Sequence, residues 1–193
     1  MPDEPSTINR QIGQTVRQLR AAAGLSLDAL AGRSGVSRSM ISSVERGDSS
    51  PTAVLLERLS AGLGVPLASL FDPPVRPASP VARLGEQVVW QDPASGYVRR
   101  AVSPAGAGSP IRIVEVRFPA GQRVTYETAA REGLVHQQVW VLEGCIEVSV
   151  GPAAHRLETG DCLAMVLDQP VSFHNPSAAP ARYAVVLAGS PIG

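Results

Sequence analysis

Apolar side chains recur at helical spacing in the N-terminal part of the chain. Intervals of four, three and four residues place one set on a single helix face: Ile12, Val16, Leu19 and Ala23. Gly24 ends this first helix, and Ser26 is suited to cap the next one. Further helices are predicted over residues 27–34, after Ser37, and over residues 53–64 and 66–71. The pattern therefore predicts a compact bundle of five short helices.

The C-terminal part carries short apolar runs instead, each of strand length and each bounded by turn residues. The runs cover residues 87–90, 97–102, 111–118, 136–142, 145–150, 162–167 and 182–188. Segments such as "SPAGAGSP" and "ETGD" separate them. Strand-length runs at this spacing predict an antiparallel barrel or sandwich.

A proline-rich segment, residues 71–80, lies between the two patterns. Its prolines lack amide donors and favour extended backbone, so we expect a semi-rigid linker. The chain is therefore predicted to hold a helical domain over residues 1–72, a linker over residues 73–83 and an all-β domain over residues 84–193.

Composition adds little to this division. Hydrophobic residues make up 44% of the chain, which is enough to build buried cores. The formal net charge is zero, and all 17 basic residues are arginine. The chain has two cysteines and shows no signal peptide or long apolar span. We therefore expect a cytoplasmic protein with neither a disulfide framework nor a membrane partner.

The predicted helices on either side of Gly35 and Val36 have the spacing of a helix-turn-helix. The second helix of such a motif can lie in the DNA major groove, with its N-terminal residues at base edges. If Ile41 and Val44 face the core, the outer side of this helix carries Arg38, Ser39, Ser42 and Ser43. The Arg38 guanidinium can bind guanine O6 and N7, and the hydroxyls can bind bases or phosphates. A small helical bundle that binds other proteins is the alternative for the same spacing.

The segment from "IGQTVRQLRAAAG" to "SPTAVLLERLSAGLGVPLASLF" resembles the phage-repressor (Xre-type) helix-turn-helix family over roughly residues 8 to 71. The resemblance implies base contacts at three of the outer positions, a phosphate contact from the Ser26 hydroxyl, and a structural salt bridge between Arg20 and Glu45. The predicted DNA-binding residues are Ser26, Arg38, Ser39, Ser42 and Ser43.

The charge of the helical part bears on how it would bind double-stranded DNA. Residues 1–75 contain seven arginines and seven acidic residues. A neutral domain attracts DNA weakly, because non-specific affinity comes from the release of counterions by basic side chains. One copy should therefore bind poorly, and a homodimer on a two-fold operator is expected.

Four motifs in the second part, "FPAG", "VWVLEG", "LETGDCLAMV" and "FHNP", resemble the cupin sensor domain that often follows an Xre-type reader. The resemblance covers roughly residues 84 to 189 and implies an antiparallel cupin β-barrel. The predicted fold class is thus multidomain, an α domain followed by an all-β domain.

Many cupins hold a divalent metal through two histidines and a glutamate in their first motif and a histidine in their second. Here the glutamate position is Gln137 and the second histidine position is Val171, and no alignment of the first motif supplies the histidine pair. We therefore expect no metal or other cofactor and no catalytic residue.

Other side chains could in principle replace the missing metal ligands. They are His136, His155, His174, Cys145, Cys162 and Glu127. Strand alternation would turn His136 and His174 away from the pocket unless a bulge intervenes. The two cysteines lie on strands that could be neighbours, so redox sensing is an alternative to buried, inert thiols.

Without a metal, the mouth of the barrel could hold a small organic effector. The candidate ligand-binding residues are Tyr126, His136, Gln137, Val139, Trp140 and Arg112. Arg112, or Arg117 on the same strand, could bind a carboxylate in bidentate fashion. Ordinary barrel core is the alternative for Val139 and Trp140, and a solvated strand face is the alternative for the arginines.

Together these features predict a sequence-specific transcriptional regulator whose cupin domain senses a small molecule, dimerises, or does both. The proline-rich linker would then transmit the state of the barrel to the helices. Two alternatives remain open: a metal-dependent cupin enzyme (a dioxygenase or isomerase) with an appended DNA-binding domain, and a barrel that serves only as a dimer interface.

Overall fold

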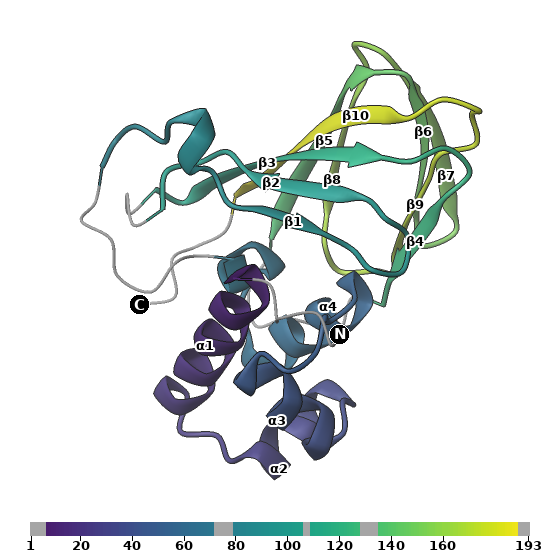
Figure 1. Cartoon of the computed structure of the whole chain (residues 1–193). Helices are drawn as coiled ribbons and strands as arrows, with labels where there is room; N and C mark the ends of the chain where they lie inside the picture. The colour runs from purple at the N-terminus through teal and green to yellow at the C-terminus, as the bar shows by residue number, and fades with distance from the viewer. Residues whose placement is uncertain (1–6, 72–78, 106–108, 128–134, 189–193) are drawn as a thin grey trace, which may run out of the picture.

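The computed structural model describes residues 7–71, 79–105, 109–127 and 135–188, in which a group of helices lies below a β domain (Figure 1). The helical part, called the reader domain below, runs from Thr7 to Phe71. Its elements are α1 (Thr7–Ala22), α2 (Leu27–Ser34), α3 (Arg38–Arg46), α4 (Ala53–Leu63) and the 3-10 helix η1 (Leu67–Phe71).

Side-chain caps start three of these helices. The hydroxyls of Ser26, Ser37 and Thr52 accept hydrogen bonds from backbone amides in the first turns of α2, α3 and α4. The fifth predicted helix is present as the 3-10 helix η1 and not as an α-helix. Its Ser69 amide donates to the Pro66 carbonyl at 2.9 Å, three residues back, and the segment is too short for the longer α-helical pattern to become established.

The core of the reader domain is apolar and closely packed. Its fully buried side chains include Ile12, Val16, Ile41, Val44, Leu56 and Leu59. Gly13 lies where α1 crosses α3, and a Cβ added there would come within 2.2 Å of the Val44 carbonyl oxygen. Only glycine therefore allows the two helices to approach this closely.

The β domain, taken here as Leu84 to Ala188, starts with the 3-10 helix η2 (Leu84–Glu86) and continues as ten strands in the described ranges. The first five are β1 (Val89–Gln91), β2 (Val98–Ala101), β3 (Ile111–Phe118), β4 (Arg123–Tyr126) and β5 (His136–Glu143). The others are β6 (Cys145–Val150), β7 (Ala153–Glu158), β8 (Cys162–Val166), β9 (Val171–His174) and β10 (Ala181–Ala188).

The strands pair antiparallel in two sheets, one with the order β1-β2-β3-β10-β5-β8 and the other with the order β4-β9-β6-β7. The antiparallel all-β prediction is confirmed at this level. Among the described residues, however, no strand pair joins the two sheets, so the structure has two facing sheets and no closed hydrogen-bonded barrel.

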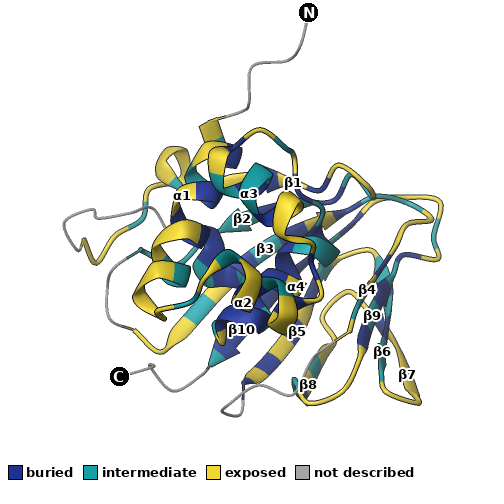
Figure 2. Cartoon of the chain, turned by 90° about the horizontal axis from the view of Figure 1, so that it is seen from below, coloured by how far each residue is buried: buried dark blue, intermediate teal, exposed yellow. Residues whose placement is uncertain are grey.

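Burial follows strand alternation in both sheets, as the dark and pale bands along the strands show (Figure 2). On β3, Val114, Val116 and Phe118 point between the sheets, while Ile111 and Ile113 point outward. Residues 73–78 of the predicted linker lie outside the described residues. None of the helices in the described ranges combines the length and hydropathy that a membrane crossing requires.

Candidate functional site

The first candidate site is the exposed face of α3. Arg38 and Ser39, the first two residues of this helix, are exposed. The Arg38 guanidinium lies 3.4 Å from the Asp28 carboxylate, and both side chains are more than half exposed. An ion pair in solvent contributes little to stability, so Arg38 can exchange this contact for a base or a phosphate at small cost.

Ser42 and Ser43, one turn further along α3, are half-buried. The Ser42 hydroxyl accepts a hydrogen bond from Arg46 Nη1 at 2.5 Å, and Arg46 Nε lies 2.6 Å from the Asp48 carboxylate. Arg38, Ser42 and Arg46 are spaced four residues apart and therefore share one helix face. Sequence reasoning missed Arg46, although this spacing could have revealed it.

Ser26 is exposed before α2, and its hydroxyl oxygen accepts the Ala29 amide hydrogen bond at 3.0 Å. A hydroxyl in this position still has its own hydrogen to donate, and a phosphate oxygen is a suitable acceptor. The structure therefore places Ser26 at the N-terminus of a helix, a common location for phosphate contacts.

The predicted salt bridge between Arg20 and Glu45 is confirmed. Arg20 Nε and Nη2 donate to the two carboxylate oxygens of Glu45 at 2.6 and 2.8 Å, which is a bidentate pair. The hydrogen bond to Glu45 raises the pKa of the Arg20 guanidinium above its ordinary value. The pair ties α1 to α3 and so fixes the helix that carries Arg38.

The second candidate site is a cavity of about 80 Å³ between the two β sheets. Five aromatic rings line it: Tyr97, Phe118, Tyr126, Phe173 and Tyr183. We call it the aromatic cavity. A single water needs about 10–15 Å³ in this measure, so the cavity has room for a molecule of several non-hydrogen atoms.

A few polar groups interrupt the aromatic wall. The Tyr97 and Tyr126 hydroxyls are 2.9 Å apart and share a hydrogen bond. Burial raises the pKa of the Tyr126 and Tyr183 phenols well above their ordinary value. Gln137 also lines the cavity, where its amide lies 3.9 Å from the Met165 sulfur, a weak contact. Apolar walls with a few polar groups are the usual form of a ligand pocket.

The reader domain supplies part of the cavity wall. Glu57 of α4, together with Pro66 and Leu67 at the start of η1, lies among the lining residues, as does Arg99 of β2. Glu57 and Arg99 are buried. Sequence reasoning missed all four residues. One signal was available for Glu57, because it follows the buried Ala53 by four residues and so falls on the buried face of α4.

The six predicted ligand-binding residues do not all meet at this cavity. Tyr126 and Gln137 line it. Val139 is fully buried but is not part of the lining. His136 and Trp140 are exposed, because they alternate with Gln137 and Val139 along β5 and point outward. Arg112 borders a different cavity.

That second cavity, of about 310 Å³, lies between the reader domain and a part of the β domain that includes β2, β3 and the segment before β1. Gln11 and Phe71 contribute from the helical side, and Arg112 contributes from β3. Arg99 borders both cavities. Arg117, five residues after Arg112, is on the opposite face of β3, where it lies 3.8 Å from Glu115.

The residues weighed as replacement metal ligands are spread over the β domain. His174 pairs with Glu147 at 3.0 Å on the outer face of β9, and Glu127 lies 3.5 Å from Arg58. His155 is exposed on β7. In the described ranges, no three histidine, cysteine or acidic side chains come close enough to hold a metal ion.

The cavity itself offers poor ligands for the metals that cupins bind. Gln137 and Val171, the two positions derived from the cupin motifs, both line the aromatic cavity. Among the described residues that line it, the polar groups are phenols, an amide, a carboxylate and a guanidinium, and none is an imidazole. This set does not fit a histidine-rich metal site.

The two cysteines lie in different sheets. Cys145 is on β6 of the four-stranded sheet, and Cys162 is on β8 of the six-stranded sheet. Both are free thiols; Cys145 is half-buried and Cys162 is exposed. The expectation that their strands could be neighbours is therefore wrong, because the apolar run of β6 crosses to the four-stranded sheet while the next run, β8, returns to the six-stranded sheet.

The fold and the exposed face of α3 define a helix-turn-helix protein, and comparison with known proteins agrees. Residues 16–70 match the helix-turn-helix family model HTH_3. The HTH-type transcriptional regulator SutR of Escherichia coli is 42% identical over 65 residues, which cover 34% of this chain and 36% of that protein. The HTH-type transcriptional regulator PuuR of Escherichia coli is 28% identical over 171 residues, 86% of this chain and 88% of that protein.

A solved structure extends the similarity to both domains. An HTH_3 family transcriptional regulator from Vibrio cholerae is 26% identical, with a TM-score of 0.76 over 96% of this chain and 98% of that one. An HTH-type transcriptional regulator of Sinorhizobium fredii is 35% identical over 66 residues, which cover 86% of its length. The chain belongs to the helix-turn-helix family of transcriptional regulators, and the Xre-type prediction is confirmed. It is a DNA-binding regulator.

Proposed function

We propose that this regulator is a homodimer that reads its operator through α3, senses a small molecule in a cupin-type β domain and is not an enzyme. The observation that carries the proposal is the contrast between the two candidate sites. Arg38 and Ser39 are exposed on α3, whereas the aromatic cavity lies between the two sheets and presents side chains suited to binding a small molecule rather than a metal.

The proposed DNA contacts divide by chemistry. Arg38 binds a guanine edge, and Ser39 and Ser43 bind neighbouring bases. Ser42 and Ser26 contact the backbone, where a hydroxyl donates to phosphate and fixes the register of the helix on the duplex. Arg46, which holds the Ser42 hydroxyl, adds a charge on the same face.

The proposed effector is small and mostly apolar, with at least one polar group. Aromatic and aliphatic side chains provide most of the wall, and the hydrogen-bonded Tyr97 and Tyr126 hydroxyls provide a donor and an acceptor. A cupin dioxygenase or isomerase would need a metal, and the lining residues present do not fit one. We therefore place the β domain among sensors.

The proposed dimer forms through the outer face of the six-stranded sheet. Four large apolar side chains are exposed there, each by more than a third: Val89, Ile111, Ile113 and Trp140. Cross-strand pairing places Val89 and Trp140 in one row across β1, β2, β3, β10 and β5, so they share a face. Two copies joined here bury a patch that a monomer would leave in water.

Selection from a random DNA library with the full chain, followed by titration of the selected duplex, tests the proposal. We expect two half-sites about one helical turn apart. Arg38→Ala should lower the affinity about 10- to 100-fold through the loss of one bidentate base contact. Arg156→Ala, which removes an exposed arginine on β7, is the matched control and should have little effect. Equal affinities of the two variants would refute the role of Arg38.

Sedimentation of the full chain with Trp140→Arg tests the dimer separately. The added charge on the outer face should convert the dimer to a monomer and weaken operator binding. A variant that stays dimeric would place the interface elsewhere without touching the role of α3.

A further inference from the structure

We propose that the reader domain senses the effector directly, because Glu57 and Leu67 form a wall of the aromatic cavity and couple its occupant to α4 and η1. The inference rests on the proposed sensor function and adds the route by which it acts. The effector would then be a molecule that touches both domains at once, in place of one enclosed by the β domain alone.

The reader domain forms part of the cavity wall. Three reader residues, Glu57, Pro66 and Leu67, share the lining with side chains from both β sheets. Glu57 is only 3% exposed, so its carboxylate belongs to the interior and not to the surface of α4. A molecule in the cavity therefore gains or loses contacts with the reader domain whenever the two domains shift relative to each other.

Hydrogen bonds join the two domains beside this wall. Asp92, in the turn between β1 and β2, accepts a hydrogen bond from the Ala53 amide in the first turn of α4 at 2.9 Å. The other carboxylate oxygen of Asp92 accepts from the Ser95 amide and hydroxyl at 2.9 and 2.6 Å. A carboxylate at a helix N-terminus is favoured by the helix dipole, so the β domain itself completes the cap of α4.

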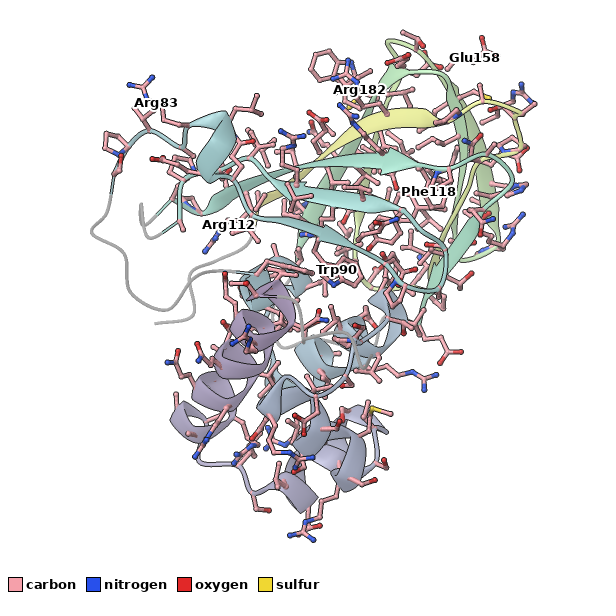
Figure 3. The ribbon with its side chains drawn as sticks, in the orientation of Figure 1. Arg83, Trp90, Arg112, Phe118, Glu158 and Arg182 are labelled. Atoms are coloured by element: carbon pink, nitrogen blue, oxygen red, sulfur yellow. The ribbon has the colours of Figure 1, made fainter. Side chains whose placement is uncertain are left out.

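Aromatic contacts connect the same junction to the cavity. Phe71 of η1 packs on Trp90 with ring centroids 5.5 Å apart, and Trp90 packs on Tyr97 at 5.8 Å. Tyr97 then contacts Phe118 at 6.0 Å inside the β domain. Trp90 lies where the sheet meets the helices, and Phe118 lies further up among the strands (Figure 3). The Arg99 guanidinium lies over the Phe71 ring at 5.0 Å.

Helix packing connects α4 to the DNA-reading surface. Gly62 of α4 packs closely on α2, since a Cβ added there would come within 2.8 Å of the Ser34 Cβ. Helix α2 starts at the Ser26 cap and precedes α3. A displacement of α4 is therefore passed to both elements that carry the proposed DNA contacts, because closely packed helices move together.

Energetically, an effector changes operator affinity only through different affinities for the two domain arrangements. Contacts to Glu57 and Leu67 supply that difference directly. A route through the proline-rich linker, the hypothesis drawn from the sequence, would not require any reader residue in the cavity.

The test uses the full chain with Trp140→Phe, which leaves Trp90 as the single tryptophan. Trp90 contacts both Phe71 and Tyr97, so its fluorescence reports on the junction. The probe is isobutanol, a small alcohol with an apolar body and one hydroxyl. Operator affinity is measured on the duplex selected by the unmodified chain.

Two variants change the cavity from opposite sides. Val171→Phe fills it from β9, and Leu67→Ala enlarges it from η1. Their matched controls are Thr125→Phe, on the exposed face of β4, and Leu55→Ala, a half-buried leucine of α4 that is not part of the lining.

We expect isobutanol to change Trp90 fluorescence saturably in the parent and both controls, more weakly in Leu67→Ala and not in Val171→Phe. Val171→Phe should also shift operator affinity by about five-fold or more, the scale of allosteric coupling, while Thr125→Phe leaves it unchanged. If Val171→Phe fails to fold, the comparison of Leu67→Ala with Leu55→Ala still shows whether the reader domain contributes to binding of the probe.

Two results would overturn the inference and separate it from the proposed function. If Leu67→Ala binds the probe like the parent and Val171→Phe abolishes binding without changing operator affinity, the cavity is a sensor pocket of the β domain alone. The proposed function then stands and the direct route falls. If the parent shows no response to the probe and Val171→Phe leaves operator affinity unchanged, the direct route and the proposed sensor role of the cavity both fall, while the roles of α3 and of the dimer are decided by their own tests.

Discussion

The proposed DNA-binding residues lie on the surface of the reader domain, whereas most of the proposed effector-binding residues lie in the interior of the β domain. In the reader domain the core around Ile12, Ile41 and Leu56 is mostly apolar, and the proposed DNA-binding side chains on α3 lie outside it. In the β domain the aromatic interior around Phe118 and Tyr183 is both core and candidate binding site. A substitution can therefore separate stability from function in the first domain but hardly in the second.

The largest expected effect is on the shared interior of the β domain. Phe118→Ala removes a ring that is 1% exposed and packs edge-on against Tyr97 and Tyr183, so we expect a loss of about 3–5 kcal/mol in the free energy of unfolding. Urea unfolding measures it. Leu84→Ala in η2, where the side chain is 69% exposed and lies outside the proposed dimer face, should cost less than about 1 kcal/mol. Similar losses for both would show that the interior is not tightly packed.

Two glycine-to-alanine substitutions test the packing of the reader domain, and we expect them to change the free energy of unfolding in opposite directions. Gly13→Ala should destabilise by about 1–3 kcal/mol, because the new Cβ meets the Val44 carbonyl. Gly32→Ala in α2 meets no atom within 4 Å and should stabilise by about 0.5–1 kcal/mol through helix propensity. Thermal or urea unfolding of both variants measures these changes in stability. Stabilisation by Gly13→Ala would mean that α1 and α3 are further apart than described.

The difference between the domains also explains how far the sequence alone could predict them. Helix caps such as Ser37 and the Arg20–Glu45 pair were predictable because each depends on a local motif or on a family pattern. The exposed residues Arg38 and Ser39 were predictable for the same reason. Only the last helix differed, since the short segment Leu67–Phe71 forms a 3-10 helix.

In the β domain, every predicted apolar run overlaps a strand, but no predicted run covers β4, β7 or β9. β7 shows why, because five of its six residues are exposed and it lies at the edge of its sheet, so it lacks an apolar signal. His136 and Trp140 were placed in the pocket by position along β5, yet alternation from the buried Gln137 and Val139 turns them outward. The part played by Glu57 was not predictable, since it depends on how two domains meet.

The buried phenols predict a dependence of stability on alkaline pH. Burial raises the pKa of Tyr126 and Tyr183 well above the ordinary 10.0, so the unfolded chain loses these protons first. Stability should be complete below pH 10 and fall as the pH rises above it, by up to about 1.4 kcal/mol per pH unit for each phenol. Urea unfolding at pH 8 and pH 10.5 checks this. Tyr183→Phe should lessen the slope; an unchanged slope would mean that Tyr183 is not shielded from water.

The smallest expected effect concerns charge on the DNA-reading face. Arg46→Ala should weaken operator binding only a few-fold, equally for all DNA sequences, and lower the salt dependence by about one counterion, because a backbone contact carries no sequence information. Asp48→Ala should act in the opposite direction, since it frees Arg46 from the pair at 2.6 Å and removes a negative charge. Binding titrations at several salt concentrations measure both.

A change in the preferred DNA sequence on Arg46→Ala would contradict this assignment and make Arg46 a base contact. If instead Arg46→Ala and Asp48→Ala shift affinity in opposite directions without moving the unfolding midpoint, charge on α3 can be tuned without disturbing the fold. The same result would be impossible at Phe118, where the binding surface and the core are one set of rings. The small effect at Arg46 would therefore sharpen the contrast between the domains more directly than the large effect at Phe118.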